Sequence, residues 1–151
     1  MPDNDLIQLY SKRILALAAG IPLTKPLEGP ADGAAKKRSP LCGSTVSVAL
    51  RLADDGRIGD FAQDVKACAL GQASAAILGG VVIGRSREEI AAGRDALRAM
   101  LKEGAAPPSP PFDGLEVLEP AKDYKNRHAS ILLSWDATLA AMDEAAARRA
   151  G

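Results

Sequence analysis

The chain of 151 residues is poor in several features that mark particular classes of protein. Its 19 basic and 19 acidic residues balance, and only 3% of its residues are aromatic. Neither a charge attraction to phosphates nor a stacking surface for bases is therefore indicated. No apolar run is long enough to span a membrane, and the N-terminal segment 1–5 is acidic where a secretory signal is basic. The composition predicts a cytoplasmic protein with neither a nucleic-acid partner nor a membrane partner.

Thiols and imidazoles are also scarce, since the chain has two cysteines, Cys42 and Cys68, and one histidine, His128. In a cytoplasmic protein a Cys42–Cys68 disulfide is not expected as the resting state. A hydrophobic content of 47% is enough for a real core at this length. We therefore expect one domain over residues 1–151, in which these three side chains are the candidates for metal or sulfur chemistry.

The two cysteines flank a segment whose pattern predicts a β-hairpin. Apolar residues occupy every second position from 46 to 52, and Asp55-Gly56 then supplies a tight turn. A second extended run, 57–67, follows with an early break in its alternation that predicts a bulge. Pairing outward from the turn places Cys42 roughly opposite Cys68. We therefore expect both thiols at one end of a sheet.

Helical patterns surround this hairpin. One begins directly after Cys68, at a position where unpaired N–H groups and the helix dipole stabilise a thiolate. Gly79-Gly80 should interrupt this helix, and it should pack on the sheet together with the next one. The other expected elements are a helix from Asp3 or Asn4 to Gly20, an edge strand at 34–38, a helix from the Ser86 capping box to Gly104, a proline-rich surface loop at 105–114, and a helix over 128–148.

Each candidate residue can also be explained without a functional role. A free cysteine is commonly a small buried hydrophobe, and a histidine at a helix start is often half-buried without a ligand. The basic cluster 36–38 is either a solvated loop or a docking spot for an acidic partner. The predicted hairpin and the helix start at Cys68 favour the functional interpretation of the thiols.

Several short motifs together resemble the IscU/NifU-type family of iron–sulfur cluster scaffolds. They are Leu41-Cys42-Gly43, Lys66-Ala67-Cys68 with Gln72-Ala73-Ser74-Ala75, Gly84-Arg85-Ser86 with Glu88-Glu89, and His128-Ala129-Ser130-Ile131-Leu132. The resemblance covers nearly the whole chain. It implies an α+β domain with a small antiparallel sheet of about three strands packed against helices, and a protein that is not an enzyme.

The resemblance also implies a site. Cys42 and Cys68 match two of the family's three cysteines, and His128 matches its histidine, so these residues are implied to hold iron or a labile [2Fe–2S] cluster. Ser44 stands where the family has the aspartate of Cys-Gly-Asp, and Ala129 stands where it has the third cysteine. A [2Fe–2S] cluster needs four ligands, so one must come from elsewhere, such as Ser44, a carboxylate, a small thiol or a second protein. The implied partners are a cysteine desulfurase and recipient apo-proteins.

Two alternatives stay open. Two sulfurs and one nitrogen, with water in the open position, form a familiar zinc site, which suggests a zinc-bearing sulfur acceptor that partners a cysteine desulfurase. The other alternative is a degenerate interaction module that keeps the fold and binds no cluster. The missing third thiol and aspartate favour these two alternatives, whereas retention of Cys42, Cys68 and His128 favours a metal or sulfur site.

Overall fold

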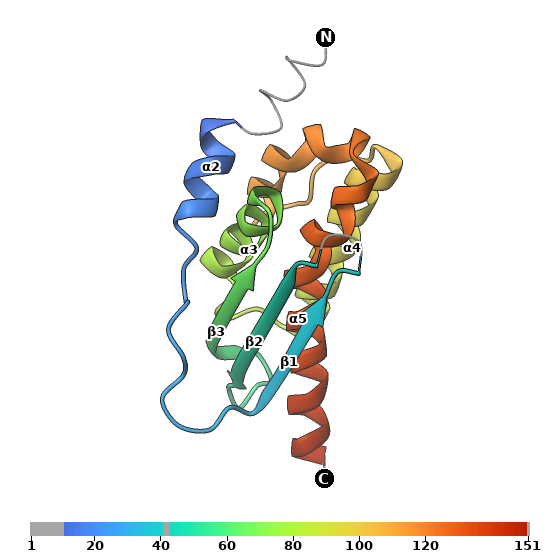
Figure 1. Cartoon of the computed structure of the whole chain (residues 1–151). Coiled ribbons are helices and arrows are strands. Elements are labelled where there is room, and N and C mark those ends of the chain that lie inside the picture. Colours follow the sequence, from blue (N-terminus) through green and yellow to red (C-terminus); the bar gives the residue numbers. More distant parts are fainter. Residues whose placement is uncertain (1–10, 41–42, 151) are drawn as a thin grey trace.

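A computed structural model describes residues 11–40 and 43–150 of the chain (Figure 1). The strands β1 (Gly33–Arg38), β2 (Thr45–Leu52) and β3 (Ile58–Lys66) form an antiparallel sheet in the order β1-β2-β3. The described helices are α2 (Lys12–Ala19), α3 (Ala69–Val81), α4 (Arg87–Glu103), the 3-10 helix η1 (Asp113–Asp123) and α5 (Lys125–Ala150). The predicted α+β class with a three-stranded antiparallel sheet is confirmed.

The hairpin forms as its sequence pattern predicted. The turn between β2 and β3 contains Gly56 at a φ of +86°, a conformation that glycine adopts without steric cost. The pairing of β2 with β3 shifts between Arg51 and Leu52, which leaves Gly59 as the extra residue of a bulge. Three of the four alternating apolar side chains of β2 are at most 2% exposed, namely Val46, Val48 and Leu50, and the fourth, Leu52, is partly buried.

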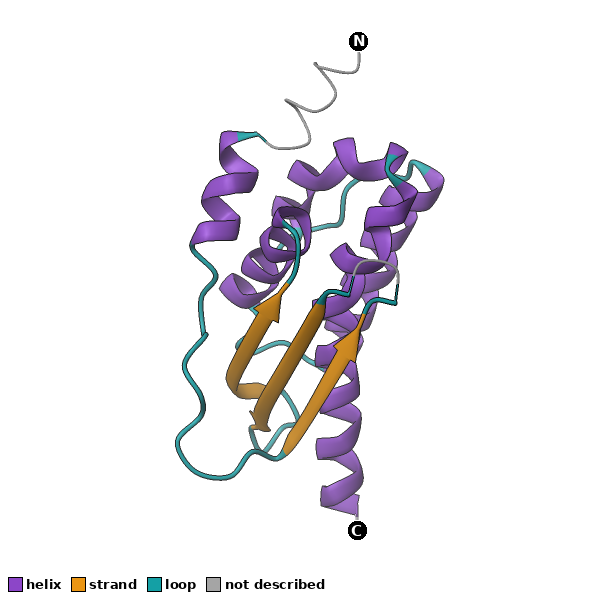
Figure 2. Cartoon of the chain, in the orientation of Figure 1, coloured by secondary structure: helices purple, strands orange, loops and turns teal. Residues whose placement is uncertain are grey.

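One face of the sheet is covered by α5, and not by the predicted pair of α3 and α4. Helix α5 contacts both β1 and β2, whereas the main strand contact of α3 is with β3, and α4 packs mainly on α5 and η1 (Figure 2). The prediction holds for the contact of α3 with β3 and fails for α4, because an apolar stripe predicts that a helix is packed and does not specify its neighbour. None of the helices in the described part of the chain is long and apolar enough to cross a membrane.

The α5 helix lies so close to β1 that a glycine is required at the contact. A Cβ atom added to Gly33 would collide with the carbonyl oxygen of Ala141 and the backbone nitrogen of Ala145. We expect Gly33→Ala to lower the free energy of unfolding by about 1–3 kcal/mol in urea titrations, because two backbones must separate. The matched control is Gly80→Ala on α3, where an added Cβ meets nothing within 4 Å. Equal stability of the two variants would contradict the close packing.

The predicted ends of several helices need correction. Helix α2 begins at Lys12 because Ser11 caps it, with its Oγ accepting a hydrogen bond of 3.2 Å from the Ile14 N–H. The predicted start at Asp3 or Asn4 lies outside the described residues. Helix α3 runs through Gly79 to Val81, since the missing side chain at position 79 leaves room for Pro22 and Gln63. Glycine there serves packing and does not interrupt the helix.

The boundaries of α4 follow the predicted signals, whereas the region after the proline-rich segment differs from the prediction. The capping box of α4 is present, with Ser86 and Glu89 exchanging hydrogen bonds of 3.2 Å, and the helix ends at Gly104 with a φ of +68°. The Ser86 N–H and the Arg57 guanidinium hold the pKa of Glu89 below its ordinary value. The proline-rich segment is irregular up to Phe112, where the unpredicted η1 follows. Helix α5 begins three residues before the predicted start, at Lys125.

Candidate functional site

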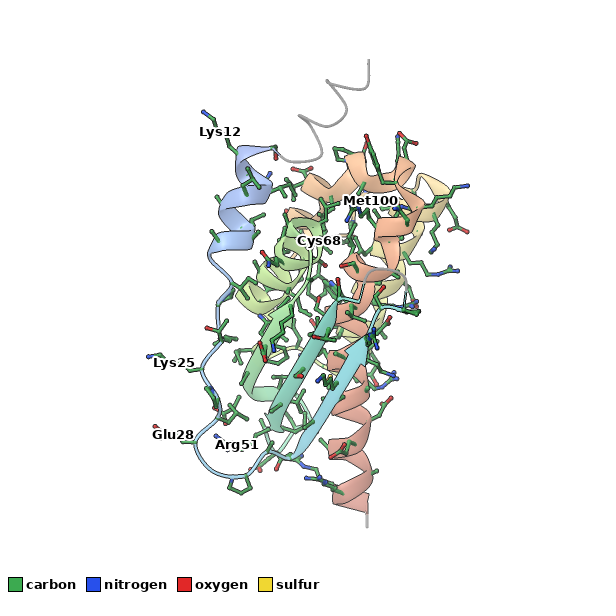
Figure 3. The ribbon with its side chains drawn as sticks, in the orientation of Figure 1. Lys12, Lys25, Glu28, Arg51, Cys68 and Met100 are labelled. Atoms are coloured by element: carbon green, nitrogen blue, oxygen red, sulfur yellow. The ribbon has the colours of Figure 1, made fainter. Side chains whose placement is uncertain are left out.

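Cys68 lies between β3 and α3 (Figure 3). It is the N-cap residue of α3, with φ −65° and ψ 168°, and its carbonyl accepts a hydrogen bond of 2.9 Å from the Gln72 N–H. The prediction that a helix begins directly after this cysteine is therefore confirmed. The side chain is half-buried, carries a free thiol and makes no capping hydrogen bond. Its sulfur is thus not used to hold the helix end.

A buried serine, Ser130, lies beside this thiol, and a second one, Ser44, lies beside Ser130. The Ser130 Oγ is 3.6 Å from the Cys68 Sγ and 3.2 Å from the Ser44 Oγ, and both serines are at most 5% exposed. A Cβ on Gly71 would collide with the Ser130 Oγ, so α3 and α5 approach closely at this point. The segment before β2, the start of α3 and the first turns of α5 therefore meet around Ser130. The contact with Ser130 was not predicted, and the only sequence signal for it was the His-Ala-Ser motif.

His128 is held in a definite orientation. Its side chain is 1% exposed, and its Nε2 lies 2.9 Å from the carbonyl oxygen of Ala121 in η1. Since a carbonyl only accepts, Nε2 is the donor of this hydrogen bond, which fixes the orientation of the ring. No described residue is a hydrogen-bond partner of Nδ1. Metal-ligating histidines are commonly oriented in this way, by a hydrogen bond from the other ring nitrogen.

The two predicted ligands within the described residues lie on different helices, with His128 in the first turn of α5 and Cys68 at the N-cap of α3. Ser130, two residues after His128, contacts Cys68. Residues two apart on a helix are about 200° apart around its axis, so the histidine ring faces η1 while Ser130 faces the thiol. Within 11–40 and 43–150, no group of three His, Cys, Asp or Glu side chains is placed to hold a metal ion. Cys42 lies outside these residues, so the set Cys42, Cys68 and His128 stays a prediction.

This fold and sequence match known proteins closely. The crystal structure of a nitrogen-fixing NifU-like protein (N-terminal) from Brucella abortus has a TM-score of 0.89 and 43% identity, over 95% of this chain and 98% of that chain. The chain belongs to the IscU/NifU-like family of iron–sulfur cluster assembly scaffolds. Scaffold proteins of this family are not enzymes, in agreement with the expectation from the sequence. No family model matches the chain.

More distant relatives of this IscU/NifU-like chain agree. The iron–sulfur cluster assembly scaffold protein IscU of Streptococcus pyogenes serotype M1 is 28% identical over 120 residues, which are 78% of this chain and 75% of that protein. A structure from Fervidobacterium islandicum AW-1, described as a cluster assembly scaffold protein for the SUF system, has a TM-score of 0.79. It is 20% identical, over 90% of this chain and 98% of that one, and shows the shared fold alone.

Proposed function

We propose that the protein is a single scaffold domain that receives iron or a labile [2Fe–2S] cluster as cargo through Cys42, Cys68 and His128. A cysteine desulfurase would supply the sulfur, and recipient apo-proteins would take the cargo. The observation that carries the proposal is the free, half-buried Cys68 thiol at the N-cap of α3 in an IscU/NifU-like fold. The thiolate is the form of cysteine that binds metals.

The donor set fits such cargo incompletely. Two thiolates and the free Nδ1 of His128 provide three donors, and a [2Fe–2S] cluster takes four. Ala129 occupies the position that the resemblance gives to a third cysteine, and the oxygen beside Cys68 is the weakly coordinating hydroxyl of Ser130. The His128 ring is almost fully buried, so an ion reaches Nδ1 only after neighbouring residues move. A partner protein or a small thiol would complete the ligand set.

The decisive experiment is the metal and acid-labile sulfide content of protein purified without oxygen, together with its absorption spectrum. Iron and sulfide in equal amounts with charge-transfer bands would support the scaffold. Zinc alone would favour a sulfur acceptor, because two sulfurs and one nitrogen with an open position suit zinc. A sulfur acceptor is tested further by adding it to a cysteine desulfurase, whose turnover it should stimulate. If the protein holds neither iron nor zinc, even after anaerobic reconstitution, the remaining alternative is a module that binds no cluster.

A substitution at position 129 tests whether a missing thiol limits cargo retention. We expect Ala129→Cys to slow the loss of iron from the reconstituted protein to a chelator several-fold, since it adds a soft ligand between His128 and Ser130. The matched control is Ala146→Cys, an exposed position farther along α5. Equal rates for these two variants would show that a thiol at position 129 does not reach the cargo.

A further inference from the structure

A second feature of the surface is a basic groove of about 770 Å³ between the end of β1, α4 and α5. Its cationic side chains come from all three elements; they are Lys37, Arg38, Arg94, Arg98, Lys102 and Lys125. The anionic side chains that line it are Asp136 and Asp143. The groove therefore carries an excess of four positive charges, in a chain whose formal net charge is zero.

The two carboxylates do not neutralise the rest of the groove. Asp136 accepts a hydrogen bond of 2.8 Å from the Arg94 Nε, and Asp143 accepts one of 2.6 Å from the Arg87 Nε. The bond to Asp136 raises the pKa of Arg94. The other five cations of the groove form no ion pair with any residue of the described part of the chain. An anionic occupant would therefore meet charges that are not already satisfied.

The floor of the groove is apolar. It is formed by α5, through side chains that include Leu132, Leu139 and Ala140. Among the described residues, no aromatic side chain lines the groove, so these residues offer no surface on which bases could stack. A basic rim around an aliphatic floor complements an amphipathic protein segment better than it complements a nucleic acid.

The spacing of the rim suits a helix. Arg94, Arg98 and Lys102 follow one another at intervals of four residues along α4, which is about 6 Å per step. Carboxylates at the same interval on a second helix would repeat this distance. The groove also reaches the candidate site, because Ala129 lines it and directly precedes Ser130, whose Oγ contacts the Cys68 Sγ.

We propose that this groove docks an acidic amphipathic segment of a partner protein and thereby holds the partner beside Cys68. Carboxylates of the segment pair with the basic rim, and its apolar side chains cover the α5 floor. The proposal gives a location to the acidic partner that the basic cluster 36–38 suggested, although only Lys37 and Arg38 of that cluster line the groove. It requires no metal and goes beyond the proposed cargo.

The test is the fluorescence anisotropy of a labelled helical peptide titrated with the full chain. The peptide has about 18 residues, with glutamates at four-residue intervals on one face and leucines on the adjacent face. We expect saturable binding that weakens with salt, and a loss of affinity of about tenfold or more in the Arg98→Glu/Lys102→Glu variant. Both positions are exposed, so the variant should fold.

The matched control reverses two exposed lysines elsewhere, Lys12→Glu/Lys25→Glu, which changes the net charge equally (Figure 3). An equal loss in this control would mean that only net charge matters and would overturn the proposal. So would equal binding of a scrambled peptide of the same composition, undetectable peptide binding, or tighter binding of a single-stranded oligonucleotide of equal charge. The Arg98→Glu/Lys102→Glu variant should still load iron like the wild type, which separates failure of docking from failure of the cargo proposal.

Discussion

Replacing Cys68 by serine is expected to abolish the loading of iron and sulfide in anaerobic reconstitution. The thiolate is the soft ligand on which a cluster or a thiol-bound iron depends, and a serine hydroxyl stays protonated and binds iron weakly. The readouts are iron content, acid-labile sulfide and visible absorbance per chain. Wild-type loading by Cys68→Ser would exclude this thiol from the site, whatever the role of Cys42.

The same substitution should leave the fold intact, so that a loss of loading has a chemical cause. Serine is among the preferred N-cap residues, and Cys68 is the N-cap of α3 without a side-chain capping bond of its own. We therefore expect unchanged or slightly increased stability in thermal unfolding. Ser130→Ala is the companion variant, because it removes the hydroxyl beside the sulfur and keeps the thiol. It should retain loading if Ser130 is not a ligand.

The strands and the start of α3 were predictable because their signals are local. The alternation in β2, the Asp-Gly turn and the change to helical spacing after Cys68 all lie within a few residues of the features they specify. The same local signals placed the capping box and the end of α4. In contrast, the packing of α5 on the sheet depends on the close contact between the backbones of Gly33 and Ala141. These residues are far apart in the sequence, so no local pattern indicates the contact.

The environment of the site was less predictable for the same reason. Ser130 is 62 residues from Cys68 and 86 residues from Ser44 in the sequence, so no periodicity relates them. The carbonyl that orients His128 belongs to η1, a 3-10 helix of 11 residues that contains Pro120. Long 3-10 helices are uncommon and have no strong sequence signature. The sequence could therefore suggest the candidate residues, whose set stays a prediction, but it could not indicate the hydrogen-bond partners of Cys68 and His128.

Trp135 joins the helices that carry the site. It is fully buried on α5, and its ring lies edge to face with Phe112, with centroids 5.1 Å apart. Its Nε1 donates a hydrogen bond of 3.1 Å to the Ser74 Oγ on α3, and that hydroxyl donates one of 2.7 Å to the Ile131 carbonyl. On α4, Gly93 has no room for a Cβ against the two rings. The helix that begins at Cys68 is thus held to the helix that carries His128.

We expect Trp135→Ala to lower the free energy of unfolding by about 3–5 kcal/mol, because it leaves a large cavity among three helices. Trp135→Phe keeps most of the apolar contact and removes only the hydrogen bond to Ser74, so its cost should be about 1–2 kcal/mol. Urea unfolding should be followed by circular dichroism, since Trp135 is the sole tryptophan of the chain and both variants lack its fluorescence. If Trp135→Ala lowers the free energy of unfolding by less than Trp135→Phe does, the packing of this side chain among three helices is contradicted. If the large loss is found, reduced iron loading by Trp135→Ala would follow from loosened α3 and α5, because the thiol and the imidazole belong to different helices that this side chain connects.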